Sequence, residues 1–183
     1  ASGWQTFWSD ELNGGSVNAS WWKALDSNYG SGSGQLQCHK PKNATVSGGL
    51  LSITAMKEPI TCGTNGSVSR AYSSGFLSSR DAGRYYPLYG RYEMRARIPQ
   101  GQGIGAAFWL RHKNGASAAE VDIMETFHAQ APGTVTQTLH FPNTLGTNVA
   151  KATTKIESGK IDITGWHTYA VEITPAAADN SQV

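Results

Sequence analysis

Apolar and polar residues alternate one by one over several short stretches of the chain. In residues 89–99, YGRYEMRARIP, the apolar positions 92, 94, 96 and 98 fall on one face and the charged positions between them on the other. A period of two is typical of an antiparallel strand with one solvated side. Residues 48–56, GGLLSITAM, and 165–174, GWHTYAVEIT, show the same alternation. Turn-forming residues separate such runs, which predicts an all-β sandwich of two antiparallel sheets.

Residues 103–127, GIGAAFWLRHKNGASAAEVDIMETF, contain two apolar runs on either side of Asn114-Gly115. This dipeptide is favoured in tight hairpins, so the two runs are predicted to be paired strands. The second run also fits an amphipathic helix, because Ala119, Ile123 and Phe127 recur at helical spacing. The turn before it and the β-branched segment 133–141, GTVTQTLHF, after it favour the strand.

Three acids, Glu120, Asp122 and Glu125, lie in the second run, AAEVDIMETFH. In a regular strand Glu120 and Asp122 share a face, but Glu125 points into the core and leaves a buried charge. A one-residue β-bulge around Ile123 and Met124 shifts the phase of the strand. We therefore predict that the three carboxylates share one face and that the apolar residues pack inward.

The bulged strand brings the two outer carboxylates to a catalytic separation. Glu120 and Glu125 are then about four strand steps apart, roughly 13 Å between Cα atoms at ~3.3 Å per residue. Side chains that each reach inward by about 4 Å leave a gap on the order of 5 Å, as between the two carboxyls of a retaining glycosidase. Acids can also simply keep a strand face soluble, but three at this spacing favour chemistry.

Composition narrows the class of protein. The chain has 183 residues, of which 39% are hydrophobic and 15% charged, which suits one folded domain. A net charge of +2 with scattered Lys and Arg argues against a nucleic-acid binder, and no apolar run has the length of a membrane span. The start, ASGWQTFWSDELNGG, is expected of a mature extracellular protein whose signal has been removed.

The chain has two cysteines, Cys38 and Cys62. Two cysteines without CxxC spacing cannot form a zinc site by themselves. A disulfide between them is the favoured interpretation, and two free buried thiols are the alternative.

The motif EVDIME matches the E-x-D-x-x-E signature of glycoside hydrolase family 16. It has the bulged form of the family's laminarinases, agarases and carrageenases, not the unbulged form of its lichenases. The segments FWSDELNG, YGRYEMRARIPQGQGIGAAFWL, QTLHF and GWHTYAVEITP also resemble family segments, in the family's order. The resemblance to the laminarinase-like branch implies a concanavalin A-like jelly roll whose concave sheet forms a polysaccharide cleft.

The resemblance also implies roles for individual residues. Glu120 resembles the family's nucleophile, Glu125 its general acid/base and Asp122 the carboxylate between them. Trp109 in AFWL resembles a cleft tryptophan, with a core position as the alternative, and His140 in TLHF resembles a histidine near the reacting sugar. Gln35 in GQLQ stands where laminarinases commonly have an acid.

The function implied by this resemblance is a secreted, retaining endo-β-1,3-glucanase that acts as a monomer without a cofactor. The alternatives are an agarase-like β-galactan hydrolase, a transglycosylase and a non-catalytic polysaccharide-binding protein. The Trp-Pro pair of laminarinases is absent from KNGASAAE, and Phe76 stands near a usual arginine, which weakens the glucan assignment. Relatives carry a structural calcium, for which no convincing ligand set is found here.

The remaining aromatic positions are predicted to be scaffold. Trp21 and Trp22 should pack below the sheet, and His167 and Tyr169 should belong to a strand. The family continues for several strands beyond PAAADNSQV. Residues 1–183 are therefore expected to be a single catalytic domain, truncated at its C-terminal end.

Overall fold

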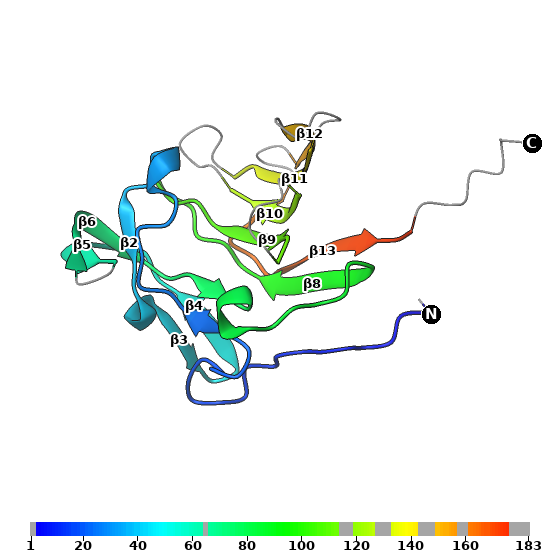
Figure 1. The fold of residues 1–183 in the computed structure, drawn as a ribbon, viewed down its shortest axis with the longest axis horizontal. Coiled ribbons are helices and arrows are strands. Elements are labelled where there is room, and N and C mark those ends of the chain that lie inside the picture. Colours follow the sequence, from blue (N-terminus) through cyan, green and yellow to red (C-terminus); the bar gives the residue numbers. More distant parts are fainter. Residues whose placement is uncertain are drawn as a thin grey trace, which may run out of the picture. The chain divides into compact units, whose positions relative to one another are not determined.

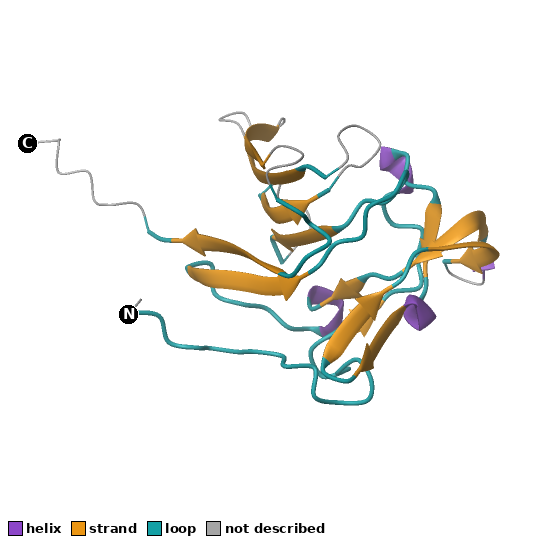
Figure 2. Cartoon of the chain, turned by 180° about the vertical axis from the view of Figure 1, so that it is seen from behind, coloured by secondary structure: helices purple, strands orange, loops and turns teal. Residues whose placement is uncertain are grey.

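The computed structural model describes residues 3–63, 66–113, 119–126, 133–142, 149–156 and 161–175. Strands make up most of its regular structure, with short 3-10 turns between some of them (Figures 1 and 2). The chain forms two compact units, Gly3–Tyr86 and the residues from Pro87 onward. Across the described ranges, the structure has no helix that is both long and apolar enough to pass through a bilayer.

The first unit contains three small sheets. The strands that form them are β1 (Lys23–Ala24) with β7 (Leu77–Ser78), β3 (Ala44–Ser47) with β4 (Leu50–Ile53), and β6 (Val68–Ser74) between β2 (Gln37–His39) and β5 (Met56–Cys62). β2 and β6 run parallel, whereas the other pairs are antiparallel as predicted. Parallel strands need a long connection, and here it is the chain through β3, β4 and β5.

The run at 48–56 contains the antiparallel strand that its alternation predicts, β4, and ends at Met56, the first residue of β5. Gly48 and Gly49, with φ of 58° and 74°, form the two-residue turn between β3 and β4. The chain then leaves β4 at Thr54, whose backbone N–H donates to the carbonyl of Asn43 at 2.9 Å. The buried Asn43 side chain returns a bond to the Thr54 carbonyl at 2.8 Å. These bonds extend the β3–β4 pairing beyond Ala44 and Ile53, and alternation alone cannot reveal the partner.

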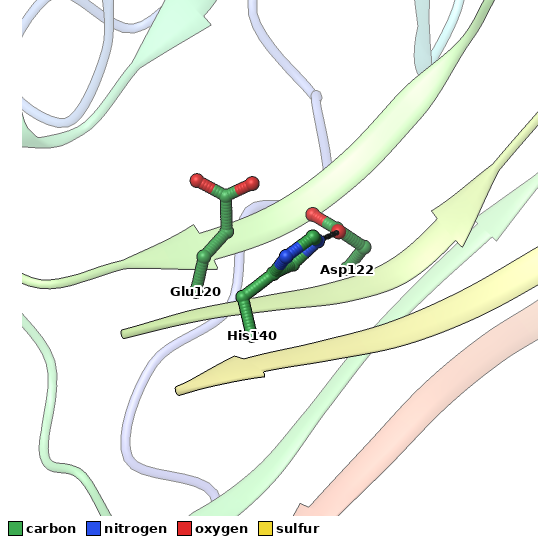
Figure 3. Close-up of side chains that lie close together, drawn as sticks. All are labelled: Glu120, Asp122 and His140. Atoms are coloured by element: carbon green, nitrogen blue, oxygen red, sulfur yellow. Dashed lines mark hydrogen bonds and ion pairs between the residues drawn. The ribbon is translucent and has the colours of Figure 1, made fainter. Parts of the chain in front are cut away.

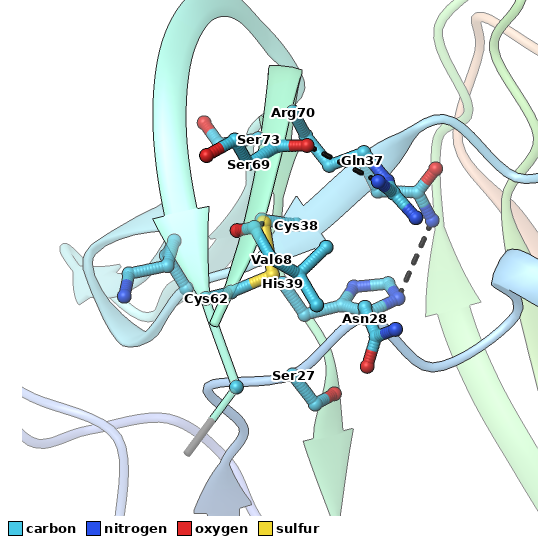
Figure 4. Close-up of a disulfide and its surroundings, with 12 residues drawn as sticks. Ser27, Asn28, Gln37, Cys38, His39, Cys62, Val68, Ser69, Arg70 and Ser73 are labelled. Atoms are coloured by element: carbon cyan, nitrogen blue, oxygen red, sulfur yellow. Dashed lines mark hydrogen bonds between the residues drawn. A yellow bond between two sulfur atoms is a disulfide. The ribbon is translucent and has the colours of Figure 1, made fainter. Parts of the chain in front are cut away.

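The predicted disulfide is present in the first unit. Cys38 in β2 and Cys62 at the end of β5 are bonded, with their Cα atoms 5.6 Å apart, and both are buried (Figure 4). β6 lies between these two strands, so the bridge ties the outer strands of the three-stranded sheet to each other.

An aromatic cluster also packs the first unit. The ring centres of Trp21 and Trp22 lie 5.1 and 5.7 Å from that of Trp8, and the ring of Tyr86 lies 5.3 Å from Trp8 and 6.5 Å from Trp21. The indole N–H of Trp22 donates to Asp10 at 3.0 Å. The predicted packing role of Trp21 and Trp22 is therefore confirmed.

The second unit contains two sheets. Its strands are β8 (Gly90–Ala96) paired with β13 (His167–Ile173), and β9 (Ala107–Arg111), β10 (Glu120–Glu125), β11 (Val135–Pro142) and β12 (Val149–Ile156) in the order β12-β11-β10-β9. All of these pairs are antiparallel, and β10 lies in the middle of its sheet. The helical alternative for residues 118–128 is thus excluded where they are described.

One apolar core joins the two sheets of the second unit. Its buried members include Ile123, Met124 and Val135 from the larger sheet and Tyr169 from β13. The alternate residues Tyr92, Met94 and Ala96 of β8 pack against it, while Glu93 and Arg95 between them are exposed. The alternation in residues 89–99 therefore predicted correctly which face is buried.

Two further predictions concern this unit. His167 and Tyr169 both lie in β13, as expected of scaffold residues. The antiparallel pairing of β9 with β10 confirms the predicted hairpin, whereas its turn at Asn114-Gly115 lies outside the described residues.

Candidate active site

The three acids of β10 lie on one face of its sheet. On β9, Glu120, Asp122 and Glu125 pair with every second residue, namely Arg111, Trp109 and Ala107. On β11 they pair likewise with every second residue, namely His140, Thr138 and Thr136. Residues directly opposite each other on paired strands share a face, and alternate residues of one strand do so too. All three carboxylates therefore project from the same face.

A β-bulge produces this arrangement. The register shifts between Asp122 and Met124 against β9 and between Asp122 and Glu125 against β11. Ile123 and Met124, the two residues at the bulge, are each 1% exposed and belong to the core. The strand thus holds one residue more than its neighbours, and that residue is buried. The predicted bulge and the inward packing of the apolar residues are both confirmed.

Asp122 is at the centre of the polar network on this face. It is only 4% exposed, and its Oδ2 lies 2.9 Å from Nε2 of His140 (Figure 3). It also shares a side-chain hydrogen bond with Glu125. A buried carboxylate needs such partners, because desolvation without them is costly. Asp122 therefore links the histidine of β11 to the acid at the far end of the motif.

Burial and mutual repulsion act on the protonation of these acids. Burial raises the pKa of Glu120, and the negative charge of Asp122 raises it further. His140 and Arg111 act in the opposite direction on this pKa. The pKa of Asp122 is also raised, by burial, although His140 and the bond to Glu125 oppose the shift. Glu120 and Asp122 thus hold their protons more tightly than free carboxylates do.

Trp109 and Arg111 continue the same face onto β9. Trp109 is the β9 partner of Asp122, and Arg111 is the partner of Glu120. The guanidinium carbon of Arg111 lies 6.0 Å from the centre of the Trp109 ring. Trp109 therefore lies on the same face as the acids and not on the core face, which was the alternative.

The same groups determine whether a metal ion is plausible here. Glu120, Asp122 and His140 each bring one donor atom within 4.8 Å of the others. Asp122 is already hydrogen-bonded to both His140 and Glu125. The expectation that no cofactor is needed stays a prediction.

Gln35 belongs to the first unit. It is exposed, just before β2, and its side-chain oxygen accepts a hydrogen bond from Nε2 of Gln37 at 2.7 Å. Its side chain lies over Gly30, where an added Cβ would come within 2.4 Å of it. Its predicted contact with substrate stays a prediction.

Arg111 is the residue of this face that sequence reasoning missed. It stands two positions after Trp109, so strand alternation alone places it on the same face as that residue. The signal was present, but the partner of Arg111 across the hairpin depends on the register of the two strands.

Comparison with known proteins identifies the family. Residues 16–179 match the model of Glycosyl hydrolases family 16. The chain belongs to this family. A "Glucan endo-1,3-beta-glucosidase" of Cryptopygus antarcticus is 34% identical over 146 residues, which are 75% of this chain and 51% of that protein. A "Beta-glucanase" of Rhodothermus marinus is 32% identical over 186 residues, covering 94% of this chain and 60% of its own length.

A solved structure agrees with this assignment. The catalytic domain of an endo-1,3-beta-glucanase (laminarinase) from Thermotoga petrophila RKU-1 superposes with a TM-score of 0.75 at 28% identity, over 92% of this chain and 69% of that one. The predicted family and jelly-roll class are therefore confirmed. The family 16 chain spans only about half the length of its relative from Cryptopygus antarcticus, 51% of that protein.

Proposed function

We propose that this family 16 chain is the catalytic part of a secreted, retaining endo-β-glycoside hydrolase that cleaves internal β-1,3 linkages of a β-glucan. The observation that carries the proposal is the common face of Glu120, Asp122 and Glu125, each paired with every second residue of both neighbouring strands. The names of the glucanases that it resembles support the polysaccharide class. The acids are all present, which favours an enzyme over a sugar-binding protein.

The first step forms a covalent intermediate. The ionised carboxylate of Glu120 attacks the anomeric carbon of the bound sugar. Glu125 gives its proton to the glycosidic oxygen, which leaves with the rest of the chain as an alcohol. The leaving part of the polysaccharide ends in a new hydroxyl group. The other part is bound through its anomeric carbon as an ester of Glu120.

The second step releases that sugar. Glu125, now a carboxylate, takes a proton from water, and the water oxygen attacks the anomeric carbon. The bond to Glu120 breaks and its carboxylate is restored. Two inversions at the same carbon retain the β configuration. A sugar hydroxyl in place of water gives transglycosylation by the same route.

Asp122 and His140 support both steps without forming bonds to the sugar. Asp122 is hydrogen-bonded to Glu125 and to His140, so it can hold the acid/base in place as its proton comes and goes. The negative charge of Asp122 also favours a protonated neighbour, which the first step requires of Glu125.

The substrate and stereochemistry are tested by product analysis with the full-length protein. Laminarin, lichenan, agarose and β-1,3-galactan are offered separately, and the first products are followed by NMR. We expect laminari-oligosaccharides of retained β configuration. Cleavage of galactan alone would contradict the glucan assignment and leave the mechanism standing, whereas inverted products would contradict the mechanism.

The nucleophile is tested by Glu120→Gln, which keeps the shape of the side chain and removes its charge. Hydrolysis should fall at least about a thousandfold with the fold intact. The matched control is Glu172→Gln in β13, an exposed glutamate paired with Arg91 at 2.7 Å, which should keep its activity. A Glu120→Gln rate near that of the control would remove Glu120 from the mechanism.

A further inference from the structure

Arg111 is a positive charge that the mechanism above does not use. It lies across the β9–β10 pair from Glu120, on the face that carries the acids. Its side chain is exposed, and its guanidinium carbon is 6.0 Å from the centre of the Trp109 ring. That distance is within the range of about 6 Å at which a guanidinium and an aromatic face attract each other.

The proposed chemistry and the surroundings of Glu120 favour opposite protonation states of its carboxyl. The proposed chemistry needs it ionised, yet burial and the charge of Asp122 both favour its protonated form. Among the described residues, the charged and titratable groups that act on it are Asp122 on its own strand, Arg111 on β9 and His140 on β11. Arg111 is permanently positive, whereas His140 is positive only when protonated.

We propose that Arg111 is a positioning residue of this site, whose guanidinium favours the ionised form of Glu120 and stacks on Trp109 to hold the indole in place. The proposal rests on the proposed function, since it needs Glu120 as the nucleophile. Arg111 does two things with different physical requirements. The effect on Glu120 needs only a positive charge, whereas the contact with Trp109 also needs the flat guanidinium.

Two substitutions separate the effect of the positive charge of Arg111 from the effect of its planar guanidinium group. Arg111→Lys keeps the charge and loses the flat group, and Arg111→Met loses both while keeping an unbranched side chain. Arg95→Met is the matched control, because the guanidinium carbon of Arg95 also lies over a tryptophan, 4.7 Å from the ring centre of Trp166, but on β8 in the sheet that does not carry the acids. The control should leave hydrolysis unchanged.

The readouts are the pH profile of kcat/KM on soluble β-glucan and KM itself. In Arg111→Met the acidic limb of the profile should move to higher pH, because the ionised nucleophile has lost a stabilising charge, whereas Arg111→Lys should keep its limb near that of the wild type. KM should rise about two- to fivefold in Arg111→Met, as expected for the loss of one exposed cation–π contact, and less in Arg111→Lys, whose ammonium can still attract the ring.

A titration followed by 13C NMR of the Glu120 carboxyl keeps this test separate from the test of the proposed function. It reports the protonation of Glu120 in the wild type and both variants even if the chain hydrolyses no glucan. A midpoint that rises in Arg111→Met and not in Arg111→Lys supports the proposal. An unchanged midpoint in Arg111→Met, or an equal rise in Arg95→Met, overturns it.

Discussion

The proposed mechanism gives different tasks to two glutamates whose surroundings differ. Burial and the charge of Asp122 raise the pKa of Glu120, and His140 and Arg111 oppose this shift. Glu125 is hydrogen-bonded to Asp122, which is buried. In the proposed mechanism, the positive groups opposite Glu120 are therefore what distinguishes the nucleophile from the acid/base.

At the residue scale, Glu125→Ala should be rescued by azide. The variant lacks the base that activates water in the second step, so the esterified sugar should accumulate on Glu120. Azide is a small anion that attacks without needing a base. We expect added sodium azide to raise turnover of an activated aryl glycoside at least about tenfold, with a β-glycosyl azide as product. NMR identifies that product.

The control for this prediction is Glu172→Ala, on which azide should have no effect. A Glu125→Ala variant that azide leaves inactive, with no glycosyl azide formed, would argue against the acid/base role of Glu125. Its unfolding by urea should be measured as well, so that loss of the fold is not mistaken for loss of the base.

At the scale of the element, the bulge in β10 reconciles two demands on one short strand. Asp122 pairs with the residues that it would meet in a regular strand. Because of the extra residue, Glu125 pairs with the residues that position 124 would meet in a regular strand. The extra residue goes into the core, where Ile123 and Met124 are both 1% exposed. A strand can thus present three acids and still bury its apolar side chains.

Deletion of Met124 should therefore leave the acids on their face. Without it, Asp122, Ile123 and Glu125 alternate regularly and meet the same partners on β9 and β11. We expect a loss of stability of about 2–5 kcal/mol, because a buried side chain is removed, but activity within about a hundredfold of the wild type. Urea unfolding and hydrolysis of laminarin measure the two effects.

Deletion of Val121 is the matched comparison, because Val121 is also an apolar residue of β10 that packs against the core. Its loss should turn Glu120 toward the core, since every residue before the deletion changes face. Activity should then fall to the level of Glu120→Gln. Equal activities of the two deletion variants, both folded, would show that the phase of the strand does not control the site.

At the scale of the whole molecule, the two compact units are stabilised in different ways. The first unit has small sheets, a cluster of tryptophans and the Cys38–Cys62 disulfide. The second unit has an apolar core between two sheets and carries all three acids. The covalent bridge thus lies in one unit and the proposed chemistry in the other.

Reduction of the disulfide should lower the free energy of unfolding of the chain. The bridge closes a loop between cysteines 24 residues apart. Loss of such a constraint on the unfolded chain costs about 3 kcal/mol. Urea unfolding with and without dithiothreitol, followed by tryptophan fluorescence, measures the change. The double variant Cys38→Ser, Cys62→Ser should be equally destabilised and insensitive to dithiothreitol; a wild type that is equally stable when reduced contradicts the prediction.

The sequence by itself determined the features that depend on neighbours along the chain. Alternation in residues 89–99 predicted which face of β8 is buried, and counting the phase from Glu120 to Glu125 required the bulge. Both follow from local geometry, because successive side chains of a strand point to opposite sides. The only two cysteines likewise had only each other as partners.

Only the tertiary structure decided which residues meet across strands. His140 reaches Asp122 from 18 positions away, and Arg111 faces Glu120 because the β9–β10 hairpin has one particular register. The two hydrogen bonds between Asn43 and Thr54 likewise join residues 11 positions apart. Alternation predicts the face on which a residue lies, but it does not predict the residue opposite it on the neighbouring strand. Partners depend on how strands align, and the packing of the whole core selects that alignment.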